Sequence, residues 1–197
     1  MYLLKLRTVQ SNAIRTLIEV LKDVLNDINI TFDASGMKIM TMDGNHVALI
    51  HIMLHADKFE EYECQSRQTI GLSMGSLHKL MKSVSNSDTV GFFITEDEPN
   101  ELGICIENAD KNQITNFKLK LLDLDHDEIK IPDVDIDCTV TMPSNDFQRM
   151  CRDMSNISDV VEISTNETTL SVKCVGDFAT QTTIIGEATH GLFFNKN

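Results

Sequence analysis

The spacing of apolar residues along the chain predicts three amphipathic helices. After each of Ser11, Ser73 and Ser144, apolar residues recur at i, i+3, i+4 and i+7, which places them on one face of a helix. A serine at the start of a helix can also cap the free backbone N–H groups of the first turn. The predicted inward positions are Ile14, Leu17, Ile18, Leu21, Val24, Leu25 and Ile28 in the first helix, Leu77, Leu80, Met81 and Val84 in the second, and Phe147, Met150, Cys151, Met154 and Ile157 in the third.

Short strand-like runs separated by turn residues flank each helix. The runs before the helices are Tyr2–Arg7, Thr69–Leu72 and Asp137–Met142. The runs after them are Ile28–Asp33, Met37–Met42 and His46–Leu54, then Thr89–Ile94, Leu102–Glu107 and Ile114–Leu121, and finally Val160–Ser164, Leu170–Val175 and Phe178–Ile185. One strand, one helix and three further strands thus occur three times, at an interval of roughly 60 to 70 residues, which is typical of an internal repeat.

The repeats predict how the chain divides into domains. Residues 123–133 are acidic and contain a proline, a composition that indicates a connector between the second and third repeats. Residues 1–122 then form a first domain of two repeats, and residues 134–197 form the first half of a second domain. Short turns between successive strands favour antiparallel pairing. We therefore predict an α+β fold built from repeated β-α-β-β-β units.

Composition limits the classes of function. Against 30 Asp and Glu the chain has 17 Lys and Arg, and its formal net charge is −13. Such a protein does not coat nucleic acid with its whole surface, because phosphate binding needs clustered cations. We expect neither a membrane helix, which needs about 20 apolar residues, nor a secretory leader. The five cysteines are odd in number and widely spaced, so they predict neither disulfides nor a zinc site and fit a reducing compartment.

The polar faces of the predicted helices carry repeated cations. Lys79 and Lys82 share one face of the second helix, and Arg149 and Arg152 share one face of the third. The first helix adds Arg15 and Lys22, although Glu19 and Asp23 dilute their charge. Two interpretations remain open from the pattern alone. The faces either meet a polyanion such as DNA or are simply solvated.

The sequence predicts no catalytic residues, no cofactor and no metal. Gly71-Leu72-Ser73-Met74-Gly75 fits the G-x-S-x-G motif of hydrolases, but that motif belongs to a parallel sheet, and Ser73 is equally explained as a helix cap. Asp123, Asp125 and Asp127 are spaced as in a calcium loop whose essential glycine and glutamate are missing. A hydrolase using Ser73 stays the weakest of the alternatives.

Several strings resemble the eukaryotic and viral sliding clamps of the proliferating cell nuclear antigen family. They are Leu21-Lys22-Asp23, Met42-Asp43-Gly44-Asn45-His46-Val47-Ala48-Leu49, Lys120-Leu121-Leu122-Asp123-Leu124-Asp125, Ile131-Pro132, Met142-Pro143-Ser144, and Phe147 to Ser155. The resemblance extends over essentially the whole chain. The chain carries three repeats where this family has four.

The resemblance implies a non-catalytic DNA clamp. In such a fold, helices line a ring and antiparallel sheets form its outside. The implied function is that of a processivity factor on duplex DNA in the nucleus or a viral replication compartment, with DNA polymerase, clamp loader and other PIP-box proteins as partners and a homotrimeric ring as the assembly. The alternative is an incomplete clamp paralogue that regulates clamp subunits or binds clamp-binding peptides without encircling DNA.

The resemblance also carries residues over to this chain. The implied DNA-facing residues are Arg7, Arg15, Lys22, Lys79, Lys82, Lys111, Arg149 and Arg152. The implied pocket for partner peptides is formed by Met42, His46, Val47, Leu49, Ile129, Ile131 and Pro132. The implied subunit interface joins the strand at Ile114–Leu121 to the strand at Phe178–Ile185 and includes Phe117, Phe178 and Ile184.

Overall fold

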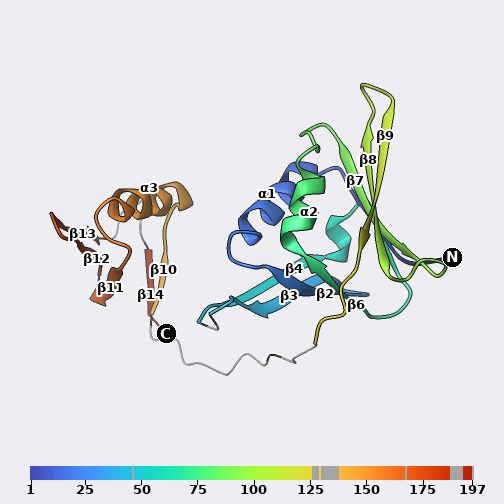
Figure 1. The fold of residues 1–197 in the computed structure, drawn as a ribbon. Coiled ribbons are helices and arrows are strands. Elements are labelled where there is room, and N and C mark those ends of the chain that lie inside the picture. The colour runs from blue at the N-terminus through green and yellow to red at the C-terminus, as the bar shows by residue number, and fades with distance from the viewer. Residues whose placement is uncertain (46, 126–128, 130–137, 167, 187–192, 197) are drawn as a thin grey trace. The chain divides into compact units, whose positions relative to one another are not determined.

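The chain divides into two compact units, Met1–Lys130 and Ile131–Asn197 (Figure 1). The computed structural model describes residues 1–45, 47–125, 129, 138–166, 168–186 and 193–196. Most of the predicted connector, residues 126–128 and 130–133, lies outside the described residues. The domain boundaries at residues 122 and 133 therefore stay a prediction.

The first unit contains two helices and nine strands among its described residues. In chain order they are β1 (Tyr2–Thr8), α1 (Ser11–Leu21), β2 (Asp27–Asp33), β3 (Gly36–Met42), β4 (Leu49–His55), a short 3-10 helix (Ala56–Lys58), β5 (Glu61–Cys64), β6 (Gln68–Ser73), α2 (Met74–Met81), β7 (Thr89–Thr95), β8 (Glu101–Asn108) and β9 (Gln113–Lys120).

Two antiparallel sheets join the first two repeats to each other. One has the order β5-β1-β7-β8-β9, and the other has the order β4-β3-β2-β6. The first strand of each repeat crosses to the other repeat, because β1 pairs with β7 and β6 pairs with β2. Neither repeat can therefore complete its own sheet, and the two fold as one domain.

The core of the first unit lies between the helices and the two sheets. Helices α1 and α2 lie side by side in Figure 1 and contact each other. Leu21 and Met81 from the helices are buried with Leu6, Ile30 and Leu72 from the strands. Burial of one such side chain is worth about 1.5 to 3 kcal/mol relative to exposure. The apolar faces of α1 and α2 thus pack against the inner faces of both sheets.

The second unit is a single further repeat. It comprises β10 (Cys138–Thr141), α3 (Ser144–Ser155), β11 (Val161–Asn166), β12 (Thr169–Val175), β13 (Thr180–Gly186) and β14 (Phe193–Lys196). Strands β11, β12 and β13 form an antiparallel sheet in that order, and β10 pairs with β14. Met150 and Met154 of α3 are buried with Leu170, Val172 and Cys174 of β12.

The structure confirms the three predicted helices and corrects their inward faces. Helix α1 ends at Leu21, so Val24 lies beyond it and is half exposed, while Ile28 alternates with Ile30 as a buried residue of β2. In α3, Phe147 and Cys151 are exposed rather than inward, because the described core of this unit contacts the side of the helix that carries Met150 and Met154.

The predicted serine caps are correct at only one helix. Ser73 Oγ accepts the backbone N–H of Ser76 at 3.5 Å, but neither Ser11 nor Ser144 makes a capping hydrogen bond. Ser11 is fully buried and donates instead to the carbonyl of Ser85 at 3.0 Å. The boundary residues of α1 and α3 are Gln10 and Pro143.

Two strands were not predicted, and β4 and β13 begin two or three residues later than predicted, β13 at Thr180 rather than Phe178. Strands β5 and β14 pair with the first strand of their own repeat, which periodicity did not reveal. Strand β4 begins at Leu49 rather than His46, since the Asp43 carboxylate accepts the backbone N–H groups of Val47 and Ala48 at 2.8 and 2.7 Å. The N–H groups of Val47 and Ala48 therefore stabilise a turn and are not available for pairing with a neighbouring strand.

Candidate functional site

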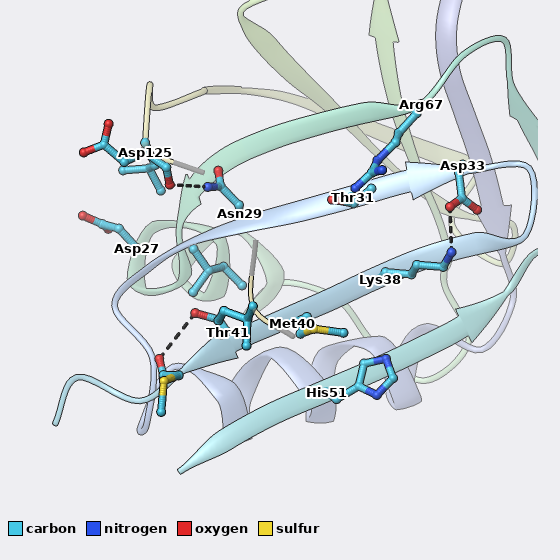
Figure 2. Close-up of a pocket in the computed structure, with 14 residues that line it drawn as sticks. Asp27, Asn29, Thr31, Asp33, Lys38, Met40, Thr41, His51, Arg67 and Asp125 are labelled. Atoms are coloured by element: carbon cyan, nitrogen blue, oxygen red, sulfur yellow. Dashed lines mark hydrogen bonds and ion pairs between the residues drawn. The ribbon is translucent and has the colours of Figure 1, made fainter. Parts of the chain in front are cut away.

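A groove of about 500 Å³ crosses the outer face of the four-stranded sheet in the first unit (Figure 2). The strands supply its floor, and the segment after β9 supplies one wall. It is lined by Asp27, Ile28, Asn29, Thr31, Asp33, Lys38, Met40, Thr41, Met42, His51, Arg67, Leu124, Asp125 and Ile129.

The floor of the groove follows from strand alternation. In β2, Ile28, Ile30 and Phe32 are buried in the core, so the side chains of Asn29 and Thr31 point to the opposite face. Met40 and Met42 are two residues apart in β3, and both line the groove. The face that does not contact the helices thus carries polar and methionine side chains.

The wall of the groove is the segment that follows β9. Leu122 forms an isolated antiparallel bridge with Gly71 of β6, and its backbone N–H donates to the Gly71 carbonyl at 2.8 Å. Asn29 Nδ2 donates to the carbonyl of Asp125 at 3.0 Å. Leu124 and Ile129 then face the groove floor as apolar lining residues. The start of the connector is therefore held on the sheet by backbone and side-chain bonds.

The lining of the groove combines apolar and polar residues. Met40, Met42, Leu124 and Ile129 supply apolar surface, whereas an ion pair between Lys38 Nζ and Asp33 Oδ2 at 2.7 Å lies in the polar part (Figure 2). Hydrogen bonds from Lys38 and then from Ser35 hold the pKa of the Asp33 carboxyl far below its ordinary value. The apolar residues suit the apolar anchors of a short peptide, and the polar residues that make up most of the lining can form hydrogen bonds to its backbone.

The structure places the predicted pocket residues in three groups. Met42 and Ile129 line the groove. Leu49 pairs with Met42 across β3 and β4 but does not line it, and Val47 is 84% exposed in the preceding turn. The remaining predicted pocket residues, His46, Ile131 and Pro132, lie outside the described residues. The seven-residue pocket as a whole stays a prediction.

Of the predicted DNA-facing residues, three exposed ones lie at the ends of helices and a fourth lies in a loop. Lys79 and Lys82 are exposed at the end of α2, and neither forms an ion pair within the part of the chain that the structure describes. Arg152 is exposed in the last turn of α3, and Lys111 is exposed between β8 and β9. These four cations are available to a partner.

Other predicted DNA-facing residues have partners within the protein. Arg7 of β1 donates to Glu107 of β8 at 2.7 Å. Arg15 of α1 donates to the carbonyl of Val84, beyond the end of α2, at 2.8 Å. Lys22 pairs with Asp23, and Arg149 pairs with Asp146 at 3.1 Å. Contact of all eight residues with DNA stays a prediction.

The G-x-S-x-G string has a structural explanation. Gly71 and Ser73 belong to β6, which pairs antiparallel with β2, whereas a nucleophile elbow needs a parallel sheet. Ser73 Oγ is occupied as the cap of α2. Among the described residues, no group of three His, Cys, Asp or Glu side chains is arranged to hold a metal ion. Nor is any described helix long and apolar enough to cross a bilayer.

The two units match two family models that adjoin in the sequence. The N-terminal domain of proliferating cell nuclear antigen matches residues 3–129, and the C-terminal domain matches residues 130–191. The chain belongs to the proliferating cell nuclear antigen family. As expected for this family, its fold is α+β, with helices packed on antiparallel sheets.

Two relatives place the chain more closely within the family. It is 37% identical over 193 residues to a probable DNA polymerase sliding clamp 1 of Paramecium bursaria Chlorella virus 1, with 96% of this chain and 74% of the relative covered. It is 30% identical over 188 residues to the proliferating cell nuclear antigen of Chaetomium thermophilum, with 95% of this chain and 72% of the relative covered. The family resemblance is therefore confirmed by a viral and a fungal protein.

The strands assigned to the subunit interface of the family lie at sheet edges. Strand β9 ends the five-stranded sheet, and β13 ends the three-stranded sheet. Ile184 is 69% exposed on β13, and Phe178 is exposed just before this strand. Phe117, in contrast, is half-buried against the core of the first unit. Their role in an interface stays a prediction.

Sequence reasoning missed most of the groove floor. Met40, His51, Asn29 and Thr31 line the groove but were not predicted. The period-2 alternation of β3 offered one signal, because Met40 lies two residues before Met42 and so shares its face. Alternation along β2 also places Asn29 on this face, but its contact with the connector had no local signal, since it depends on the pairing of β2 with β6 and on the path of the connector.

Proposed function

We propose that this chain acts as a DNA polymerase sliding clamp, a non-catalytic processivity factor that encircles duplex DNA and tethers a polymerase to it. Its membership of the proliferating cell nuclear antigen family carries the proposal. The viral relative is named a probable DNA polymerase sliding clamp, and neither relative is named as a regulator. The site of action is then the nucleus or a viral replication compartment.

The exposed cations of α2 and α3 support binding to duplex DNA. Lys79, Lys82 and Arg152 concentrate positive charge on helices of a chain whose net charge is −13. Contacts from such residues go to phosphates, which are the same at every base pair and so permit sliding. These helices therefore supply the main cations of the proposed DNA-facing surface in a chain that is acidic as a whole.

The groove on the outer face supports peptide docking. Its methionines and the apolar residues of the connector would accept the aliphatic and aromatic anchors of a PIP-box segment. Polymerase, clamp loader and other PIP-box proteins are the partners that would carry this segment. The proposed assembly is a homotrimeric ring, in which the edge strands β9 and β13 of neighbouring subunits pair.

Primer extension on linear and closed circular templates tests the proposal. A ring threads onto the open end of a linear duplex without a loader but cannot enter a closed circle. We therefore expect the chain to lengthen the products of a PIP-box-bearing polymerase on primed linear DNA alone. Equal stimulation on both templates, or none on the linear one, would contradict encirclement.

Substitutions in the groove test the docking part of the proposal. Met42→Ser combined with Ile129→Ser removes apolar contact from floor and wall, so we expect stimulation on linear DNA to fall at least about tenfold. Val20→Ser is the matched control, because Val20 is half exposed on α1 and does not line the groove. Equal losses in the groove variant and the control would place docking elsewhere.

A further inference from the structure

Asn29 and Gly71 face each other where the connector begins. They are direct partners in the antiparallel pair of β2 and β6. Cross-strand partners project from the same face of a sheet, so the Asn29 side chain adjoins the place where Gly71 has none. The pair thus presents a hydrogen-bonding side chain beside an empty position on the outer face. Neither the helix cap at Ser73 nor the groove floor explains why residue 71 is a glycine.

The empty position at Gly71 is filled by the connector. A Cβ atom at residue 71 would lie 2.4 Å from the carbonyl oxygen of Leu122 and 2.9 Å from Cγ of Leu124. Both distances are below ordinary van der Waals contact. The bridge between Gly71 and Leu122, with its 2.8 Å hydrogen bond, therefore needs glycine at this position for reasons of space.

Asn29 holds the same segment three residues further on. Its Nδ2 donates to the carbonyl of Asp125 at 3.0 Å, as Figure 2 shows. Leu122 to Asp125 is consequently attached to the sheet at both of its ends. Leu124 lies between these attachments and lines the groove, and Ile129 lines it four residues beyond Asp125.

We propose that Asn29 and Gly71 form a latch that fixes the start of the connector on the sheet and thereby sets the width of the partner groove. This inference rests on the proposed function, because it names the residues that position the peptide site. Both are positioning residues: they act through Leu124, which lines the wall of the groove. A wall fixed before binding has less conformational freedom to lose when a peptide docks, and affinity is higher for that reason.

Three variants test the latch with two independent measurements. Gly71→Ala fills the space under the connector, Asn29→Ala removes the donor, and Asn29→Asp keeps the shape but not the donor. The measurements are binding of a fluorescein-labelled PIP-box peptide and hydrogen exchange of the Leu122 amide, which donates to Gly71. We expect each variant to bind about three- to tenfold more weakly and to exchange the Leu122 amide faster, since one hydrogen bond or one close approach is lost.

Met42→Ser is the control that separates the latch from the groove itself. It should weaken peptide binding without changing exchange at Leu122, because Met42 lies on the floor in β3. The double variant Gly71→Ala, Asn29→Ala should lose little more affinity than the weaker-binding single variant, because both changes release one segment. If Gly71→Ala fails to fold, the two Asn29 variants carry the test.

Either of two results would overturn the latch. One is unchanged Leu122 exchange in the folded variants, and the other is faster exchange with wild-type peptide affinity. A wild-type chain that binds no PIP-box peptide is a different failure: it overturns the proposed docking function and the effect on the groove. The exchange rates of Leu122 then still decide whether Asn29 and Gly71 hold the connector.

Discussion

Three serines stand at the starts of the three helices, but their hydroxyl groups have different partners. Ser73 caps α2, Ser11 is buried and donates to Ser85, and Ser144 makes no capping bond. A serine near a helix start favours a cap because its oxygen can reach the second or third N–H of the helix. Which partner it takes depends on neighbours from elsewhere in the chain, as the loop at Ser85 shows for Ser11.

At the residue scale, Asp33 links stability to pH. Hydrogen bonds from Lys38 and Ser35 lower its pKa in the folded state below the unfolded value of about 3.9. A group with a depressed folded pKa stabilises the fold above its unfolded pKa and loses that contribution as pH falls toward the folded pKa. We therefore expect Asp33→Asn to lower the free energy of unfolding at pH 7, with the gap to wild type shrinking as pH falls below about 4.

Urea unfolding of both proteins at neutral pH and near pH 3 measures this gap. Lys38 and Asp33 are 39% and 27% exposed, so solvent screens the pair and the gap should also narrow in high salt. Asp97→Asn is the control, because Asp97 is exposed between β7 and β8 and forms no ion pair among the described residues. A gap for Asp33→Asn that is the same at both pH values would contradict the assignment.

At the element scale, the end of α2 carries two exposed cations that are proposed to face DNA, Lys79 and Lys82. Replacing Lys79 and Lys82 with Ala should weaken duplex binding and reduce the slope of log K against log salt by about 2, since each phosphate contact contributes about 0.9. The free energy of unfolding should change by less than about 0.5 kcal/mol, because both side chains are exposed. Filter binding over a salt series measures the slope.

Lys118→Ala provides the comparison for that experiment. Lys118 is an exposed cation of β9 that pairs with Glu98 and Glu101, so its charge is already neutralised on a sheet. We expect the slope of log K against log salt for the Lys118→Ala variant to equal that of the wild type. An unchanged slope in the Lys79 and Lys82 variant would remove α2 from the DNA-facing surface. Arg15 is a poorer probe, because its bond to Val84 makes its removal a test of folding as well.

At the scale of the whole molecule, the edge strands predict self-association. Unpaired N–H and C=O groups on β9 and β13 invite strand pairing, and two different edges give a head-to-tail contact that can close into a ring. Ile114 at the start of β9 and Ile184 in β13 are 66% and 69% exposed. Replacing both with Lys should weaken association at least about tenfold, because charge on an edge disfavours pairing.

Light scattering at tens of micromolar reports the assembly mass. We expect a homotrimer for wild type and a lower mass for the Ile114→Lys, Ile184→Lys variant, with Val20→Lys on α1 as the exposed control. A wild-type chain that is monomeric under these conditions would refute the edge model. Phe117→Asp is a less suitable probe, since Phe117 packs against the core of its own unit and a charge there would destabilise that unit as well as the interface.

The sequence by itself determined the repeated units and the family. The period of 3.6 in the helices and the alternation in the strands are local properties of the sequence. They therefore predicted α1, α2, α3 and most strands correctly. The missed strands β5 and β14 are short and make their ladders with residues far away in the chain. A four-residue strand carries too little local pattern to predict by itself.

Only the tertiary structure decided which faces meet. The alternation of apolar and polar residues predicts which residues share a face of β2. It does not predict that β6 of the next repeat pairs with β2. Once that pairing exists, Asn29 meets Gly71, the connector lies over both, and the groove acquires its wall. Such contacts join residues that are remote in sequence, and their geometry is set by the packing of the two repeats around one core. Periodicity specifies a face of an element, whereas the partner of that face is chosen by the fold as a whole.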